Sequence, residues 1–260
     1  IGSKNVAEIT LNRPESLNTF NTSLAEQLYD ALLKLDADQK VRVVLLKGAG
    51  KAFCAGADLK ELSKSGTCDK GAIHAIAAHY HMAIQEIRRT AKPVIAAING
   101  LAAGGGFSMA LACDFRVMER SALLKLSYTS NGLSIDGGGT FTLPRIVGIA
   151  KAMEIAALDP PISSEQALSW GLVTEVIEDG ESAERAAALI HEIRKTSPTS
   201  FAASKALFNE AFSTNFETQL EKEREFLSSC TVHPTGQARF TGIQKKSRSP
   251  LRYDTQSSGW

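Results

Sequence analysis

Two glycine-rich turns in the sequence could each present a backbone N–H group to a ligand: Ala55–Leu59, which reads AGADL, and Gly104–Gly106. Glycine allows a positive φ and lets another group approach the backbone closely. The first N–H groups of a helix have no partner within the helix, so they can point at an anion or a developing oxyanion. Two such N–H groups converging on one oxygen would form an oxyanion hole, often the largest single contribution to catalysis. Tight packing of a strand against a helix is the alternative explanation for either turn alone.

A third glycine-rich loop, at positions 131–140 (NGLSIDGGGT), carries a carboxylate, Asp136. A carboxylate in such a loop can act as a general base that accepts a proton and returns it. Burial beside Leu133 and Ile135 would disfavour the charged form of Asp136, which would help it both to take and to return a proton. The alternative is a structural role, because an aspartate near the start of a helix often caps free N–H groups with its side chain.

The histidines and cysteines do not predict a metal site. His74, His79 and His81 share one expected helix but lack the acidic partner of a zinc-binding helix pattern, so we expect solvated or core histidines. The four cysteines are scattered without Cys-x-x-Cys spacing, which is typical of a reducing compartment. Two of them, Cys54 and Cys113, are expected to be small core residues.

Strands and helices must bring the three loops together. A strand expected at Pro93–Ile98 leads through Asn99–Gly100 into the second glycine turn, and a helix is expected from Phe107 onward. We expect Lys51–Leu59 to be a loop. The other expected strands are 6–11, 41–46, 115–118, 124–126 and 172–177, and the other expected helices include 71–89, 183–195, 201–212, 216–228 and 234–246.

Two capping-box signatures, Ser23-x-x-Glu26 and Ser163-x-x-Gln166, predict where further helices begin. Strands that alternate with helices, followed by helices only, indicate an α/β core with a helical C-terminal piece.

Composition excludes several classes of protein. The chain has a formal net charge of +1, and 43% of its residues are hydrophobic and 22% charged, which is ordinary for a globular protein. Without a basic excess, nothing indicates nucleic-acid binding, and no apolar run reaches the roughly 18 residues of a membrane span. The first residues lack signal-peptide character, so we expect a cytoplasmic protein, while a true N-terminus further upstream leaves an organellar signal open.

In this order and spacing, the motifs resemble the enoyl-CoA hydratase/isomerase family, whose members are also called crotonases. The resemblance covers almost the whole chain. The matching segments are Asn12–Pro14, Leu17–Asn18, Phe53–Leu59, Lys92–Pro93, Asn99–Gly106, Cys113–Asp114, Gly132–Leu133, Gly138–Thr140, Leu143–Arg145 and Ala167–Leu172.

The resemblance implies an α/β spiral of β-β-α units with the CoA pocket in residues 1–196. It also implies a helical C-terminal region, residues 197–260, that mediates assembly into a homotrimer or a dimer of trimers. The substrate would be an acyl-CoA thioester, with no separate cofactor because coenzyme A is part of the substrate. The thioester oxygen would bind the N–H groups of Ala57 and Gly105, which would stabilise an enolate.

The resemblance also places the CoA moiety. Lys245 or Lys246 would meet the CoA phosphates, in its own or in a neighbouring subunit. The alternative is that these lysines are only part of the solvated surface. The adenine end would lie along a segment that contains Ala55, Asp58, Leu59 and Lys60.

Family hydratases carry two glutamates that activate water, and this chain has neither. Ser108 and Tyr128 occupy those positions and are expected to line the substrate site, with plain packing as the alternative. Asp136 lies where some family isomerases carry an acid/base aspartate. The run from Asp136 to Thr140, followed by Leu143–Arg145, is most similar to the ring-epoxide isomerases of phenylacetyl-CoA breakdown and to Δ3,Δ2-enoyl-CoA isomerases. The resemblance therefore implies an enoyl-CoA isomerase in which Asp136 shuttles a proton between carbons 2 and 4.

Two other functions stay open at this point, because one fold can host many reactions. Hydration or thioester hydrolysis would need another acid, for which Glu61 is the candidate. A protein that binds CoA esters without turnover is the third possibility. The choice rests on one aspartate and two missing glutamates.

Overall fold

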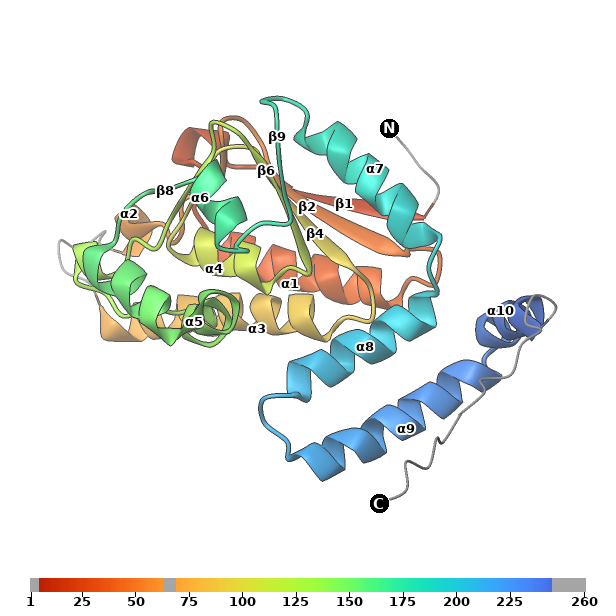
Figure 1. Ribbon diagram of the computed structural model, residues 1–260. Helices are drawn as coiled ribbons and strands as arrows, with labels where there is room; N and C mark the ends of the chain where they lie inside the picture. The colour runs from red at the N-terminus through yellow and green to blue at the C-terminus, as the bar shows by residue number, and fades with distance from the viewer. Residues whose placement is uncertain (1–4, 63–68, 245–260) are drawn as a thin grey trace, which may run out of the picture.

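The computed structural model describes residues 5–62 and 69–244 (Figure 1). Within these ranges the strands are β1 (Val6–Leu11), β2 (Val43–Gly48), β3 (Ala52–Cys54), β4 (Val94–Ile98), β5 (Leu101–Ala103), β6 (Phe115–Glu119), β7 (Leu123–Lys125), β8 (Ile162–Ser163) and β9 (Glu175–Ile177). The helices are α1 (Thr22–Ala37), α2 (Leu59–Leu62), α3 (Lys70–Arg89), α4 (Gly105–Ala112), α5 (Gly139–Leu158), α6 (Ser164–Ser169), α7 (Ser182–Arg194), α8 (Pro198–Glu210), α9 (Phe216–Val232) and α10 (Pro234–Gln244), with short 3-10 turns η1 (Pro14–Ser16) and η2 (Thr129–Asn131).

From β2 to β7, consecutive strands alternate between two sheets, which confirms the expected spiral of β-β-α units. The first sheet has the order β1-β2-β4-β6-β9, and the second has the order β3-β5-β7-β8. Pairing is parallel throughout the first sheet, and in the second sheet only β7 and β8 run antiparallel. No helix in the described ranges is long and apolar enough to cross a bilayer.

Strand β4 lies at the centre of the first sheet because both of its faces are apolar. Side chains alternate between the two faces of a strand. Ile95 and Ala97 pack with residues of α7, whereas Val94, Ala96 and Ile98 belong to the larger core that includes α1 and α3. Parallel sheets need this cover on both faces, and Figure 1 shows α7 on one side of the sheet and α1 and α3 on the other.

Two short strands were not expected from the sequence. The segment Lys51–Leu59, expected to be a loop, contains β3, and β5 directly follows the turn at Asn99–Gly100. Each has three residues, too few for a period-2 pattern to show. These strands matter for the site, because β3 and β5 pair in parallel and each is followed by one of the two glycine turns.

One of the two expected capping boxes is wrong. Helix α1 begins at Thr22, and Asn21 caps it by accepting a hydrogen bond from Leu24 N, so Ser23 lies inside the helix. Asparagine is as good an N-cap as serine, and here it comes two residues earlier. The box at Ser163 is confirmed, with both reciprocal hydrogen bonds to Gln166 present.

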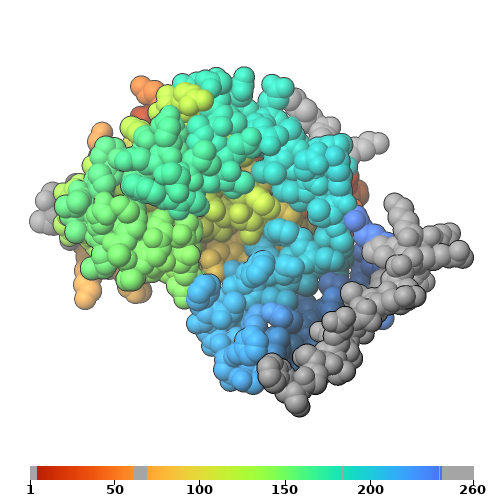
Figure 2. All heavy atoms as spheres, in the orientation of Figure 1, coloured from red at the N-terminus to blue at the C-terminus, as the bar shows by residue number. Residues whose placement is uncertain are grey.

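The last helices extend away from the α/β core (Figure 1), and Figure 2 shows them in blue beside the main body. No residue of α9 is buried. The division into a core of residues 1–196 and an assembly region of residues 197–260 stays a prediction.

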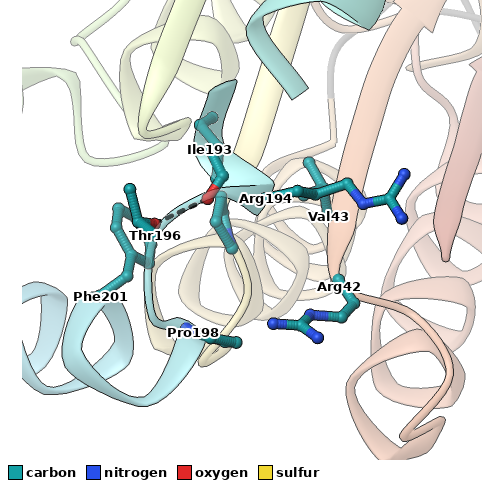
Figure 3. Close-up of a pocket in the computed structure, with 8 residues that line it drawn as sticks. Arg42, Val43, Ile193, Arg194, Thr196, Pro198 and Phe201 are labelled. Carbon is teal, nitrogen blue, oxygen red and sulfur yellow. Dashed lines mark hydrogen bonds between the residues drawn. The ribbon is translucent and has the colours of Figure 1, made fainter. Parts of the chain in front are cut away.

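The turn from α7 to α8 packs against the start of β2, where Arg42, Val43, Arg194 and Phe201 surround a small cleft (Figure 3). Thr196 closes this turn by donating a hydrogen bond of 2.7 Å to Ile193 O. The cleft has a volume of about 10 Å³. That is about enough for one water molecule, so it is not a substrate site.

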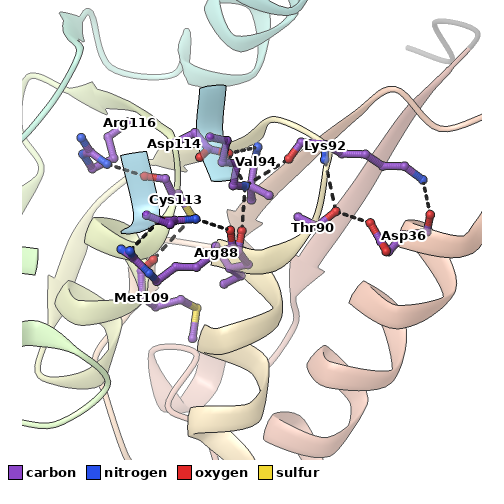
Figure 4. Close-up of polar contacts among 12 residues, drawn as sticks. Asp36, Arg88, Thr90, Lys92, Val94, Met109, Cys113, Asp114 and Arg116 are labelled. Atoms are coloured by element: carbon purple, nitrogen blue, oxygen red, sulfur yellow. Dashed lines mark hydrogen bonds and ion pairs between the residues drawn. The ribbon is translucent and has the colours of Figure 1, made fainter. Parts of the chain in front are cut away.

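A buried lysine fastens α8 to the core. Lys205 Nζ lies 2.8 Å from Asp114 Oδ2 and also donates to Ile87 O at 2.9 Å. The same Asp114 oxygen accepts a hydrogen bond from Val94 N (Figure 4). The Lys205–Asp114 pair therefore joins α8 to α3 through Ile87 O and to β4 through Val94 N. Burial raises the pKa of Asp114, and the Lys205 ammonium opposes that rise. Lys205 therefore compensates a carboxylate that would otherwise be costly to keep in the core.

We expect Lys205→Met to lower the free energy of unfolding by roughly 3–5 kcal/mol, because it leaves Asp114 without its cation. Urea denaturation followed by circular dichroism measures this loss. Lys195→Met is the control, since it removes an exposed ion pair with Glu192 and should cost less than about 1 kcal/mol. Similar losses in the two variants would contradict the anchoring role.

Candidate functional site

The first glycine turn is tied to the loop that precedes α1. Ala55 N donates to Leu17 O, and Phe20 exchanges hydrogen bonds with the turn through Gly56 O and Asp58 N. Gly56 has a φ of +98°, a conformation that favours glycine. These hydrogen bonds use the carbonyl of Gly56 and the N–H group of Asp58, and they leave the Ala57 N–H group available.

Asn18 and Arg13 hold that loop in place. The buried Asn18 side chain donates to Ala49 O at 2.9 Å and to Ala52 O at 2.8 Å. Arg13 forms an ion pair of 2.9 Å with Asp58, whose side chain is only 12% exposed. The side chain of Asp58 therefore has a structural partner, and its expected contact with CoA, through the backbone, stays a prediction.

The second glycine turn lies directly against the first. A methyl group built on Gly56 would lie 3.3 Å from Gly105 N, and one on Gly106 would lie 1.9 Å from Cys54 O. Gly104 takes a φ of +53° just before α4, so Gly105 N is a free amide at a helix N-terminus. Among the residues that the structure describes, neither Ala57 N–H nor Gly105 N–H has a protein acceptor. The two predicted donors are thus neighbours with free N–H groups.

Two stacked aromatic rings pack against Gly105. Phe20 and Tyr80 stack with centroids 4.2 Å apart, and Tyr80 donates a hydrogen bond of 2.5 Å to Gly105 O. Burial raises the pKa of Tyr80 far above its usual value, so the hydroxyl stays a donor. Sequence reasoning missed Tyr80, although its helical spacing from Ile76 and Ile84 could have placed it on the buried face of α3.

The third glycine loop brings Asp136 to the same region. Ser108, in the first turn of α4, donates to Asp136 O at 2.9 Å, and Gly137 is so close to Tyr80 that a methyl group there would lie 2.6 Å from its hydroxyl. The Tyr128 hydroxyl donates a hydrogen bond to Asp136 Oδ1. Burial, and then the charge of Asp136, raise the pKa of Tyr128, so it donates throughout the physiological pH range. Ser108 and Tyr128 therefore both hold Asp136 in place.

Two expectations about Asp136 are wrong. Its side chain does not cap α5, because Gly138 is the N-cap residue and no side chain bonds there. Its side chain is also not enclosed by apolar neighbours, since it is 33% exposed and Leu133 is itself exposed. The backbone supplies the start of α5 instead, with Gly137 and Gly138 both at positive φ. The carboxylate is thus free for chemistry rather than used in folding.

His81 is a candidate functional residue that the sequence analysis did not single out. It was expected to be solvated or part of the core, but its Nε2 lies 3.6 Å from Asp136 Oδ2 and accepts a hydrogen bond of 3.2 Å from Gly137 N. His79 faces Glu26 instead, and His74 is exposed. Nothing in the spacing of the three histidines separates them, because the contact depends on where the loop after η2 returns across α3.

The remaining predicted residues lie at the edge of this region or outside it. Leu59 and Lys60 are exposed, and Ala55 is half-buried. The side chain of Glu61, and Lys245 and Lys246, lie outside the described residues.

A cavity of about 390 Å³ starts next to Asp136, at His81 and Gly137, and extends along α3 past Ile84 to Arg88. Among residues 5–62 and 69–244, no group of three His, Cys, Asp or Glu side chains could hold a metal ion.

Together, these groups form a site with two free N–H groups in adjoining turns and one half-buried carboxylate, to which Tyr128 donates while Ser108 donates to the Asp136 backbone carbonyl. The N–H groups can stabilise negative charge on an oxygen. The carboxylate can accept and return a proton.

Comparison with known proteins agrees with this geometry. The family described as enoyl-CoA hydratase/isomerase matches residues 2–248. The chain is 37% identical over 226 residues to the 1,2-epoxyphenylacetyl-CoA isomerase of Escherichia coli K12, covering 86% of each protein. It is 35% identical over 221 residues to a probable enoyl-CoA hydratase of Rhodobacter capsulatus, covering 85% of this chain and 84% of that protein. Among solved structures, an enoyl-CoA hydratase from Polaromonas sp. JS666 superposes with a TM-score of 0.89 at 32% identity, covering 97% of this chain and 98% of that one.

We expect Cys54 and Cys113 to be inert, as the sequence predicted for small core residues. Both are buried, and burial raises the pKa of each thiol to about 12, which leaves almost no thiolate at neutral pH. Iodoacetamide at about pH 8 should leave both unmodified in the native protein and alkylate both in urea, as measured by peptide mass spectrometry. Cys230, which is half-buried, is the internal comparison. Alkylation of Cys54 in the native state would contradict this expectation.

Proposed function

Because the chain belongs to the enoyl-CoA hydratase/isomerase family, we propose that it is an acyl-CoA isomerase that moves a carbon–carbon double bond. The observation that carries this proposal is the pairing of free N–H groups at Ala57 and Gly105 with one carboxylate, Asp136. The positions at which family hydratases carry their glutamates hold Ser108 and Tyr128, and both serve Asp136. The site thus offers one carboxylate base, which is what a proton shuttle needs.

The proposed reaction needs one proton and no other reactant. Asp136 takes a proton from the carbon next to the thioester or from the carbon two positions further along, and the electron pair of that C–H bond moves into a dienolate. The N–H groups of Ala57 and Gly105 stabilise the charge on the dienolate oxygen. Asp136 then returns the proton to the other carbon, so the double bond moves and no atom is gained or lost.

The CoA moiety would lie along Ala55, Asp58, Leu59 and Lys60, where Leu59 and Lys60 are exposed at the rim of the first turn. The Arg13–Asp58 ion pair supports this proposal, because it fixes the backbone that CoA would contact. Coenzyme A enters as part of the substrate, so the reaction needs no separate cofactor.

Hydration is the second candidate, and one observation favours it. His81 beside Asp136 gives the site a second group that can exchange protons at neutral pH. Two such groups could activate a water molecule, as the two glutamates of family hydratases do. Names among the relatives include both an isomerase and hydratases, so they do not choose between the two reactions.

A direct assay separates the candidates. With a Δ3-enoyl-CoA substrate, we expect formation of the conjugated Δ2 product and a loss of at least ~10²-fold in kcat in Asp136→Asn, the loss typical of a removed general base. Absorbance follows the conjugated product, and mass spectrometry detects any uptake of water. Asp179→Asn is the control, because this aspartate only accepts a hydrogen bond from Ser121 N at the surface. Isomerisation that survives in Asp136→Asn would contradict the shuttle, and uptake of water would favour hydration.

We also propose that the C-terminal helices assemble the chain into a homotrimer or a dimer of trimers. Helices α5 and α9 expose large apolar side chains that a single chain leaves uncovered, and apolar side chains gathered on a surface typically mark an interaction site. These side chains are Ile149, Met153 and Leu158 on α5, and Phe216, Leu220, Phe226, Leu227 and Val232 on α9.

Leu227→Glu should weaken that assembly, because it would bury a carboxylate in an apolar contact. We expect the mass measured by light scattering after size exclusion to fall from an oligomer to a monomer as the protein is diluted. Thr218→Glu, near the N-terminus of α9 where an acidic side chain is favourable, is the control and should leave the mass unchanged. A wild-type protein that is monomeric at all concentrations would contradict the proposal.

A further inference from the structure

The two oxygens of Asp136 have different partners. Oδ1 accepts a hydrogen bond from the Tyr128 hydroxyl, whereas Oδ2 lies 3.6 Å from His81 Nε2. A hydrogen bond to a carboxylate oxygen favours its charged form and lowers its affinity for a proton. Oδ2 is therefore the oxygen on which a proton would be carried, and His81 is next to it.

The hydrogen bond from Gly137 N defines the state of His81. An amide N–H can only donate, so His81 Nε2 is an acceptor and the neutral ring carries its proton on Nδ1. This hydrogen bond is 3.2 Å long, at the outer end of the usual range, so a stronger donor can displace it. Nε2 lies 3.6 Å from Oδ2, so a movement of less than about 1 Å would let it accept a proton carried on Oδ2 in place of the Gly137 N–H group.

No cation competes for this proton among the described residues that face His81. Tyr80 lies beside it on α3 with ring centroids 5.9 Å apart, and Tyr128 lies behind Asp136. Arg88 lines the same cavity, but it is two turns of α3 away, about 10 Å along the helix axis. Glu26 on α1 faces His79 rather than His81. The nearest charge that His81 meets is the carboxylate of Asp136.

The exposure of the pair matters for a proton shuttle. The side chains of Asp136 and His81 are 33% and 44% exposed, so water can reach them. A proton held on Asp136 alone would exchange with that water before it returned to the substrate. A proton shared between Oδ2 and Nε2 has two partners and is held more firmly.

We propose that His81 is a positioning residue that retains the transferred proton on Oδ2 of Asp136 between its departure and its return. When Asp136 takes the proton from carbon, the C–H bond breaks and an O–H bond forms at Oδ2, which then donates to His81 Nε2. When the proton returns, the O–H bond breaks and His81 again accepts from Gly137 N. This inference rests on the proposed isomerase function, and it adds a second group to what was expected to be a single-carboxylate site.

The pair itself is tested without turnover. In protein labelled with ¹⁵N-histidine, we expect the titration midpoint of His81 to fall by at least about half a pH unit in Asp136→Asn, because the neutral amide no longer stabilises the imidazolium. His81→Gln assigns the resonance. The His79 resonance is the internal control and should not move, since its neighbour is Glu26. An unchanged midpoint for His81 would overturn the proposal, whatever the enzyme catalyses.

The role in the shuttle is tested with His81→Gln and His81→Phe in deuterium oxide. Glutamine can still hydrogen-bond to Asp136 but cannot take up a proton, whereas phenylalanine can do neither. We expect wild-type product to keep the proton of the substrate, and both variants to incorporate more solvent deuterium per turnover, with KM little changed. His79→Gln is the matched control.

The outcomes separate the two proposals. A shifted midpoint together with greater solvent exchange in both variants supports the role of His81. Equal solvent exchange in wild type and variants overturns it. A shifted midpoint in a protein that does not isomerise any Δ3-enoyl-CoA supports the pair and contradicts the isomerase function instead.

Discussion

The site depends on one constraint, the direct contact between two backbone turns. Gly56 and Gly105 approach so closely that a single methyl group would meet the opposite backbone nitrogen at 3.3 Å, and Gly106 leaves no room for any side chain against Cys54 O. Only glycine permits this approach. Because the turns touch, the free N–H groups of Ala57 and Gly105 lie beside each other, and the strands β3 and β5 that lead into them are paired in parallel. The remaining groups are arranged around this contact: Tyr80 holds Gly105 from below, and Ser108 links the first turn of α4 to the loop of Asp136.

Much of this arrangement could be predicted from the sequence, because the relevant signals are local. The run after Pro93, the glycine turns and the Ser163 capping box are read within a few residues. They gave β4 and α6 correctly and placed the start of α4 two residues late. Strands β3 and β5 have only three residues, so no periodic pattern could reveal them. The cap of α1 was misplaced by two residues because Asn21 and Ser23 are both good capping residues, and only the backbone path decides between them.

The tertiary contacts of the candidate site were harder to predict for a physical reason. Asp136 was singled out as the candidate base, and the sequence suggested that its side chain is buried or caps a helix, but it is 33% exposed and caps no helix. His81 lies 55 positions earlier in the chain and contacts Asp136 only because the loop before α5 crosses α3. A histidine on an amphipathic helix carries no local sign of such a partner. Ser108 and Tyr128 were expected near the substrate, and in the structure both donate hydrogen bonds to Asp136, one to its backbone carbonyl and one to its carboxylate.

The parallel pairing of β3 with β5 also has a consequence for how the chain folds. The two turns that present the N–H groups of Ala57 and Gly105 are separated in the chain by the whole of α3. A long loop must close before these turns meet, and such long-range contacts form slowly. Local structure such as α3 or α5 can appear earlier and independently. In a nascent or partly unfolded chain, helices such as α3 would therefore form well before the two N–H groups come together to stabilise negative charge. Activity should return late in refolding, together with the last long-range contacts rather than with helix content.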